Sequence, residues 1–185
     1  MKEIEQLDLE NYVDNKESTF RLPTKGRYTF RAPDSFPDAA FGRTKNGDLS
    51  VQIDPTIVGP TNEGFTVKYT KVSAKTFYRD GKPVSQAGDY LRATGVTGVV
   101  RNEADLANLI EQTAGRLYDA KLDWRGFNKH TGFEIKGMER FPKNADGSYQ
   151  SWVEDPTPGA VDPETGKAWR VRANLVIDRF IPVGE

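Results

Sequence analysis

A six-residue segment from Gly59 to Gly64 (GPTNEG) has the glycine spacing of a phosphate-binding loop. In such a loop a lysine follows the second glycine and a helix begins there, so that a cation and backbone N–H groups hold the phosphates. Phe65 occupies the lysine position here, and the residues after it alternate as in a strand. The segment lacks both parts of a nucleotide site, and we do not predict nucleotide hydrolysis.

The other side chains with catalytic chemistry do not form a familiar pattern. His130 is the only histidine and the chain has no cysteine, so histidine-dependent triads and zinc clusters cannot be assembled. A helix cap and a turn explain Ser85 and Lys82 better than serine–lysine catalysis does. Asp119 and Asp123 would lie about 13 Å apart along a strand, which is too far to share a magnesium ion. We predict a protein that is not an enzyme and uses no metal or cofactor.

Basic residues beside aromatic residues recur in four segments of the chain. These segments are residues 27–31 (RYTFR), 68–79 (KYTKVSAKTFYR), 124–129 (WRGFNK) and 169–172 (WRVR). Single-stranded nucleic acid is bound by cations along its phosphates and by flat rings against its bases. The recurrence of both residue types therefore predicts a surface that binds single-stranded nucleic acid.

The predicted binding residues are the cations and rings of these segments that a strand or a loop tip would present. They are Arg27, Arg31, Lys68, Lys71, Lys75, Phe77, Tyr78, Arg79, Trp124, Arg125, Phe127, Lys129, Arg170 and Arg172. A structural interpretation competes, because cations on strands are normally solvated and rings are normally buried. On that interpretation Tyr28, Phe30 and Tyr69 belong to the core. The four rings of the binding set divide about evenly between the core and an exposed platform; they are Phe77, Tyr78, Trp124 and Phe127.

The charge of the chain is unevenly distributed, although 26 basic and 27 acidic side chains nearly cancel. Residues 1–19 hold six acidic side chains against Lys2 and Lys16. We predict an acidic flexible arm over residues 1–20. One domain is predicted over residues 21–185, with a loop insertion at residues 143–167.

Composition also predicts the compartment. A chain without cysteine forms no disulfide, which is typical of a reducing cytosol. No apolar run approaches the roughly 20 residues that cross a bilayer, and the N-terminus lacks an apolar signal core. We predict a cytoplasmic protein with no membrane partner.

Hydrophobic periodicity predicts the elements that must position these residues. Strands are predicted over residues 26–32, 48–54 and 64–79, with a bend or bulge near Ser73-Ala74 because sixteen residues exceed an ordinary strand. A hairpin is predicted within residues 115–142 and a last strand over residues 168–181. Helices are predicted over residues 85–94 and 102–114, with Ser85 and Asn102 as N-caps. A helical insertion after the third strand fits a mainly β Greek-key barrel of the OB type. The alternative is a two-sheet β-sandwich with a helical crossover.

Short motifs carry a resemblance to a known family. They are Gly26-x-Tyr28-Thr29-Phe30, residues 91–95 (LRATG), residues 115–122 (GRLYDAKL) and residues 138–142 (MERFP). The chain resembles small phage-encoded single-stranded-DNA-binding proteins with OB-like barrels, which are associated with replication and recombination genes. The resemblance covers about residues 24–142 and 168–182. The insertion at 143–167 and the N-terminal position of the acidic segment depart from the family pattern.

The resemblance implies a phage protein, made in the bacterial cytoplasm, that binds single-stranded DNA without sequence preference. It also implies replication or recombination proteins as partners. The alternative function is that of a structural or adaptor protein, in a virion or an oligomer, that does not bind DNA. A homo-oligomer is compatible with both functions.

Overall fold

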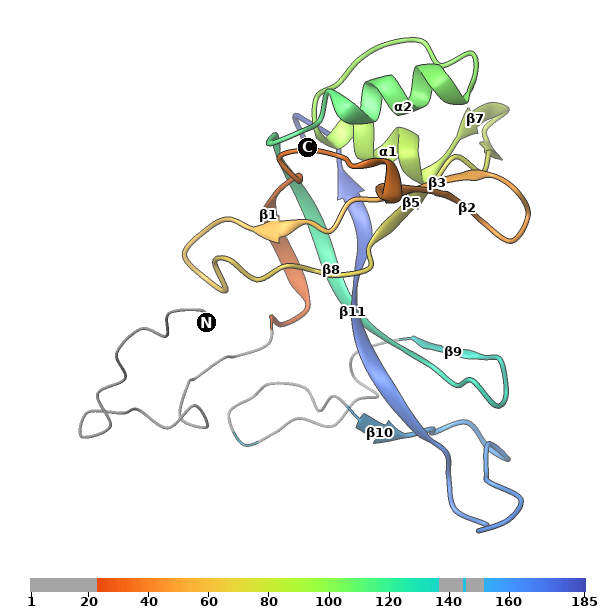
Figure 1. Ribbon diagram of the computed structural model, residues 1–185. Coiled ribbons are helices and arrows are strands. Elements are labelled where there is room, and N and C mark those ends of the chain that lie inside the picture. Colours follow the sequence, from red (N-terminus) through yellow and green to blue (C-terminus); the bar gives the residue numbers. More distant parts are fainter. Residues whose placement is uncertain (1–22, 137–144, 146–151) are drawn as a thin grey trace, which may run out of the picture.

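The structure is a computed structural model that describes residues 23–136, 145 and 152–185. Antiparallel strands dominate these residues, so the predicted mainly β class is confirmed. Two long paired strands, β8 (Leu117–Phe127) and β11 (Arg170–Ile181), run from a larger main body into a smaller distal lobe (Figure 1). The distal lobe is defined as residues 124–136 and 152–173, and the main body as residues 23–123 and 174–185.

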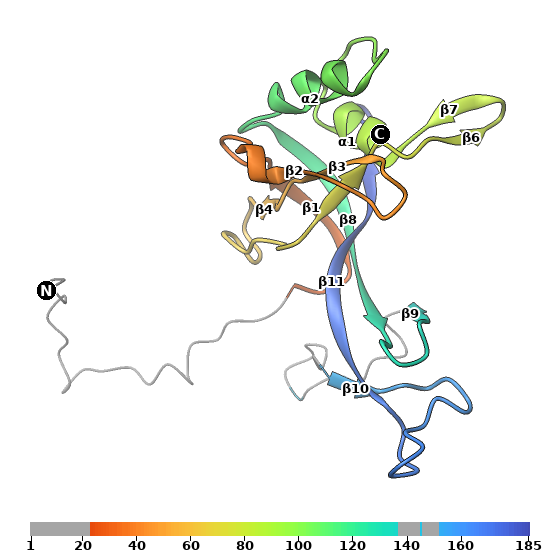
Figure 2. The ribbon, with the colours of Figure 1, turned by 45° about the vertical axis from the view of Figure 1, so that its right-hand side comes forward.

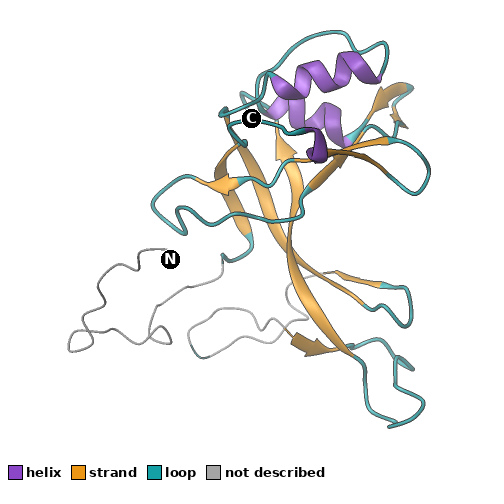
Figure 3. Cartoon of the chain, viewed as in Figure 1, coloured by secondary structure: helices purple, strands orange, loops and turns teal. Residues whose placement is uncertain are grey.

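The remaining elements are short. The other strands are β1 (Gly26–Arg31), β2 (Phe41–Arg43), β3 (Leu49–Gln52), β4 (Thr56–Ile57), β5 (Lys71–Ser73), β6 (Phe77–Arg79), β7 (Lys82–Val84), β9 (Glu134–Lys136) and β10 (Trp152–Glu154). The helices are α1 (Gln86–Ala93), α2 (Glu103–Glu111) and a 3-10 turn, η1 (Asp38–Ala40). Both α-helices lie at the end of the main body that points away from the distal lobe (Figure 3).

The described strands form separate antiparallel sheets. The largest has the order β10-β11-β8-β1-β4, and β9 pairs with the far end of β8. A second sheet has the order β2-β3-β5, and the hairpin β6–β7 stands alone. The first two sheets are joined where β3 leads into β4, but β5 and β11 do not pair with each other. Among the described residues no barrel closes, so the predicted OB-type barrel is not confirmed, and neither is the sandwich.

Local sequence signals explain why both predicted α-helices are confirmed. Ser85 Oγ accepts a hydrogen bond from the Gly88 N–H at 3.0 Å, and Asn102 Oδ1 accepts one from the Asp105 N–H at 2.8 Å. Each cap satisfies a backbone donor that the first helical turn leaves free. The strand predicted over residues 64–79 is interrupted near Ser73-Ala74, as expected, because β5 ends at Ser73; it is also interrupted earlier, because Tyr69 adopts φ 61° and the chain turns before β5 begins.

The alternation of β8 divides its inward side chains between two cores. Tyr118, Ala120 and Leu122 are buried in the main body. Farther along the strand, Trp124 is buried in the distal lobe with Ile135, Val153 and Val171. Leu175 of β11 packs against both cores, so the two long strands connect them.

Two predicted segments fall partly or wholly outside the described residues. The acidic arm over residues 1–20 lies outside them, as do residues 143–144 and 146–151 of the predicted insertion. The described part of the insertion includes the short strand β10, which begins at Trp152 and pairs with β11. Its Val153 belongs to the distal core.

Two buried tyrosines differ in how their hydroxyls are satisfied. The rings of Tyr90 and Tyr118 meet edge to face with centroids 5.3 Å apart. The Tyr90 hydroxyl lies 2.8 Å from Thr113 Oγ1, whereas no described residue forms a hydrogen bond with the Tyr118 hydroxyl. Burial raises the pKa of Tyr90 to about 12 and the pKa of Tyr118 well above its ordinary value.

We expect Tyr118→Phe to stabilise the protein by about 1 kcal/mol, because it removes a buried hydroxyl that has lost water without gaining a partner. We expect Tyr90→Phe to destabilise it by about 1 kcal/mol, because it breaks the hydrogen bond to Thr113. Urea unfolding measures both changes as shifts of the midpoint at constant slope. A Tyr118→Phe variant as unstable as Tyr90→Phe would contradict the assignment of an unpaired hydroxyl.

The same pair provides a check by pH. Tyrosine in an unfolded chain ionises near pH 10, below the folded pKa values of both side chains. The folded state therefore keeps its protons to higher pH than the unfolded state, and stability falls as the pH rises above 10. The fall is expected to be smaller in Tyr118→Phe than in the natural sequence.

Candidate nucleic-acid interface

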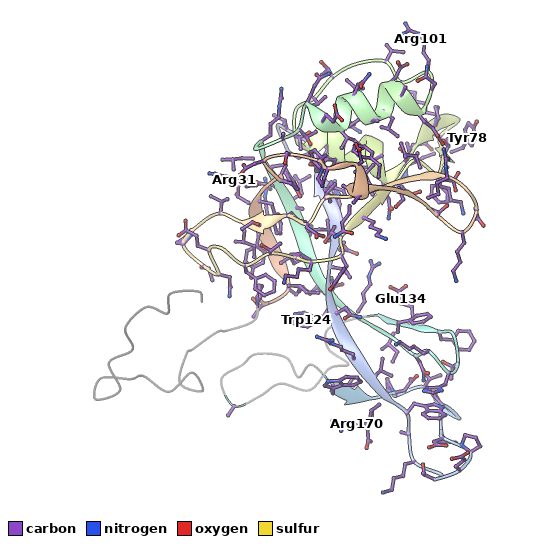
Figure 4. The ribbon with its side chains drawn as sticks, viewed as in Figure 1. Arg31, Tyr78, Arg101, Trp124, Glu134 and Arg170 are labelled. Atoms are coloured by element: carbon purple, nitrogen blue, oxygen red, sulfur yellow. The ribbon has the colours of Figure 1, made fainter. Side chains whose placement is uncertain are left out.

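The structure does not bring all predicted binding residues onto one surface. Arg31 on β1, Tyr78 on β6 and Arg170 at the start of β11 lie on three well-separated parts of the molecule (Figure 4). One subset nevertheless lines a single groove. Its members are Lys68, Lys71, Trp124, Arg125 and Arg172.

This groove has a volume of about 850 Å³ and lies between residues 64–71 and the middle of β11. Lys68 and Lys71 line one wall, and Arg172 and Asn174 line the other. The groove therefore occupies the open seam where β5 and β11 do not pair. Its two walls come from parts of the chain that only the fold brings together.

A tight turn presents the first wall. Val67 is buried in the main core, and its N–H donates to Pro55 O at 2.8 Å. The Thr70 N–H donates to Asp54 Oδ1 at 3.1 Å, and Thr70 Oγ1 donates to Val67 O at 2.7 Å. These anchors hold residues 67 and 70 to the body and leave the two residues between them at the tip of the turn.

Tyr69 lies at that tip and is 81% exposed. Its φ of 61° falls in the left-handed region, where a bulky residue is strained. The prediction that Tyr69 belongs to the core is wrong. Phe65, Val67 and Tyr69 share one parity, so a regular strand would have buried all three, but the turn reverses the direction of the third.

The groove contains both free and engaged cations. Those that form no salt bridge with any described residue are Lys68, Lys71 and Arg172. Arg125 differs, because its Nη2 lies 2.6 Å from Asp178 Oδ1 and its Nη1 lies 3.5 Å from Glu134 Oε1. Arg125 is therefore neutralised by acidic neighbours and contributes less positive potential than the sequence predicts.

A row of side chains continues from the groove across the sheet of the distal lobe. Trp152 on β10 stands opposite Arg172 on β11. The β8–β11 ladder ends at the pair Ala173–Gly126, so Phe127 of β8 and Arg172 of β11 are the next residues beyond its last pair. The two rings are 49% and 52% exposed. Paired cross-strand residues are about 5 Å apart, so the Trp152 ring and the Arg172 cation are neighbours. These two residues, with Phe127 at the end of the neighbouring ladder, are here called the Arg172 row.

Trp124 is a correction to the predicted site. Its side chain is only 2% exposed, and its Nε1–H donates to Pro23 O at 3.1 Å. A ring enclosed in this way cannot stack on a base. Trp124 instead supports the floor of the groove from inside the distal core.

The two predicted residues of β1 lie away from the groove, because β8 separates β1 from β11 in the sheet. Arg27 is engaged: its Nη2 lies 2.7 Å from Asp119 Oδ2 and donates to Glu185 O at 3.1 Å. Partial burial works against ionisation of Asp119, but hydrogen bonds from Thr29 and Arg27 outweigh it and hold its pKa below the ordinary range. Arg31 is exposed and forms no salt bridge with a described residue.

A polar contact fixes the loops that carry the far end of the sheet. Asn128 Nδ2 donates to Asp155 Oδ2 at 2.6 Å, and both residues are buried. Burial opposes ionisation of Asp155, but hydrogen bonds from Asn128 and Thr157 hold its pKa below the ordinary range. The His130 ring stacks on Trp169 with centroids 3.7 Å apart. Both contacts connect the β8–β9 loop to residues 155–169 and so brace the sheet that carries the Arg172 row.

The remaining predicted residues belong neither to the groove nor to the row. Lys129 and Arg170 are exposed elsewhere in the distal lobe. Lys75, Phe77, Tyr78 and Arg79 are exposed on the β6–β7 hairpin and the segment that leads to it. Conversely, the predicted set omits two exposed rings, Tyr69 in the groove lining and Trp152 opposite Arg172, although both lie beside cations that it includes.

The part of the chain that the structure describes contains no group of three or more histidine and acidic side chains placed to hold a metal ion. Neither described α-helix has the length and apolar character of a membrane span. Comparisons with protein-family models, curated proteins and solved structures found no match to this chain.

Proposed function

We propose that this protein binds single-stranded DNA without sequence preference, in the groove and along the Arg172 row. One observation carries the proposal: Lys68, Lys71 and Arg172 converge on one groove without salt bridges to described residues, beside the exposed ring of Tyr69. A role in phage DNA replication or recombination, in the bacterial cytoplasm, is part of the same proposal.

The chemistry of the groove suits a flexible polyanion. Lys68, Lys71 and Arg172 form no salt bridge with a described residue, so their charges are available to phosphates. Neutralising phosphates also releases counterions condensed on the DNA, which favours binding. The exposed rings of Tyr69, Trp152 and Phe127 provide flat surfaces for bases. Every base has a π-face, so stacking on these rings needs no particular sequence.

We also propose that the main body is an OB-type barrel opened at one seam. The order of β1, β3, β5, the two helices, β8 and β11 follows the strand order of that fold, with the helices before the fourth strand. β1 pairs with both β4 and β8, and β8 pairs with β11, as the cyclic arrangement requires. β1 meets the second strand of the cycle only through β4, which follows β3 in the chain, and the proposed DNA groove lies between β5 and β11, which do not pair.

Fluorescence anisotropy with labelled oligo-dT tests the proposal at about 50 mM and about 200 mM salt. We expect binding that weakens as salt rises, by about 0.7 logarithmic units of affinity per logarithmic unit of salt for each phosphate contact. A chain that binds no oligo-dT at the lower salt contradicts the proposal. The structural or adaptor function would then be the one to pursue.

Tyr69→Asn separates binding from stability. The change removes the stacking surface, which contributes about 1–3 kcal/mol per base, so we expect oligo-dT binding to weaken by about 5- to 150-fold. Asparagine tolerates the left-handed conformation better than tyrosine, so thermal stability is expected to stay equal or to rise. Anisotropy and thermal unfolding of the same sample measure the two effects.

The matched control is Tyr78→Asn, which removes a ring that is 77% exposed but lies on the β6–β7 hairpin. It is expected to leave oligo-dT binding within about two-fold of the natural protein. Equal losses in the two variants would show that the groove is not the stacking site.

A further inference from the structure

The hairpin β6–β7 projects from the main body, clear of the sheets that form the groove (Figure 2). Asp80 and Gly81 have φ values of 52° and 72°, so a tight two-residue turn joins its strands. Almost every residue of the hairpin is exposed, including Tyr78 and Phe77. An isolated two-stranded ribbon is only marginally stable in water, so this ribbon gains little from its own packing.

The tip of this ribbon contains an arrangement that disfavours folding. Arg79 and Lys82 stand directly opposite each other across the two strands. Like charges in this position are destabilising, and no described carboxylate forms a salt bridge with either residue. Lys75 adds a third cation, with its Nζ 5.2 Å from the centroid of the Phe77 ring. An anion bound at the tip would relieve the repulsion between the paired cations.

The ribbon is also joined to the proposed groove by a short stretch of chain. Lys71 lines the groove, and Phe77 begins the ribbon six residues later, so their Cα atoms are at most about 22 Å apart. Cations recur along this stretch at Lys68, Lys71, Lys75 and Arg79. A nucleic acid strand that leaves the groove on this side would therefore reach the ribbon within a few nucleotides.

We infer that the ribbon tip binds the phosphates of duplex DNA that adjoins the single strand in the groove, so that the preferred ligand is a junction between single- and double-stranded DNA. This inference rests on the proposed function. A projecting two-stranded ribbon has the shape that the major groove of B-DNA, about 12 Å wide, admits. A flexible single strand instead needs a concave track, which the groove offers and the ribbon does not.

The test compares three labelled DNAs by anisotropy: dT15 alone, a 20-base-pair blunt duplex, and the same duplex with a dT15 tail. We expect the natural protein to bind the tailed duplex about 10-fold or more tighter than dT15. The deciding variant is Lys82→Glu, which places a carboxylate opposite Arg79. This change is expected to stabilise the ribbon, because it replaces a like-charge pair with an opposite-charge pair, so a loss of binding cannot be attributed to unfolding.

In Lys82→Glu we expect the affinities for the tailed duplex and for dT15 to become about equal. The affinity for dT15 is expected to stay within about two-fold of that of the natural protein. Arg31→Glu on β1 is the matched charge reversal and is expected to leave the preference intact. Equal affinity of the natural protein for tailed duplex and dT15 overturns the inference, as does a Lys82→Glu variant that loses dT15 binding to the same extent. Failure of the natural protein to bind dT15 at all would instead contradict the proposed function.

Discussion

Reversing both groove lysines, Lys68→Glu together with Lys71→Glu, is expected to weaken oligo-dT binding by about 100-fold or more at about 0.1 M salt. Each lysine forms no salt bridge with a described residue, so each has its full charge available for a phosphate. A charge-assisted hydrogen bond contributes about 1.5–3 kcal/mol, and two of them account for the expected loss. The added carboxylates repel the DNA further.

The salt dependence distinguishes lost phosphate contacts from misfolding. Losing two contacts lowers the slope of the logarithm of affinity against the logarithm of salt by about 1.4. Both lysines are exposed, so thermal stability is expected to change little. The control is Arg31→Glu with Arg170→Glu, which reverses two exposed cations outside the groove lining and is expected to weaken binding by no more than about five-fold. A control as defective as the lysine variant would show that general positive charge, and not the groove, sets the affinity.

The local fold was largely predictable because short-range rules decide it. Ser85 and Asn102 each place a side-chain acceptor before a helix, and both form the expected cap. The alternation along β8 correctly predicts that Tyr118 and Trp124 point inward, since apolar residues of one parity share a face. Such rules involve residues only a few positions apart, so the sequence contains all the information they need.

The site was less predictable because it depends on which distant segments meet. Nothing local to Arg27 shows that Asp119 will accept its guanidinium hydrogen bonds, or that Asp178 and Glu134 will flank Arg125. The two sheets separate β5 from β11, and this open seam arises from long-range pairing that periodicity does not specify.

Two aromatic residues, Trp124 and Tyr69, show what periodicity leaves open. Periodicity assigns a ring to a face of a strand but does not say whether that face is covered. The period of β8 turns Trp124 inward but does not say what covers it; Ile135, Val153 and Val171 pack against it and bury it in the distal core. Tyr69 was assigned to the core by parity, and the turn between Val67 and Thr70 places it in solvent.

Trp124→Ala is expected to destabilise the protein by about 3–5 kcal/mol, the usual cost of truncating a buried aromatic side chain. Trp124 is the largest of the four buried side chains that form the distal core, and it also holds Pro23 through its Nε1–H. The remaining three aliphatic side chains cannot fill the cavity. The main core has its own, larger set of buried residues. We therefore expect the distal lobe to unfold before the main body in this variant.

Amide hydrogen exchange measures where the stability is lost. We expect the amides of β9 and β10 to lose protection in Trp124→Ala, while α1 and α2 keep theirs, since local opening requires only the weaker part of a structure to unfold. Loss of protection throughout the chain would contradict the division into two cores. Trp152→Ala is the matched control: it removes an exposed indole, so it is expected to cost less than about 1 kcal/mol.

Tryptophan fluorescence distinguishes the role of Trp124 from that of Trp152. The conservative change Trp124→Phe keeps most of the ring volume in the distal core, and oligo-dT is still expected to quench the emission of the variant. In Trp152→Phe most of the quenching is expected to disappear, because Trp152 is the indole that stands beside Arg172 in the exposed row. If quenching disappears in Trp124→Phe and persists in Trp152→Phe, Trp124 contacts the DNA and the Arg172 row does not. If Trp124 supports the distal lobe and Trp152 contacts the bases, changes at Trp124 lower stability and changes at Trp152 weaken binding.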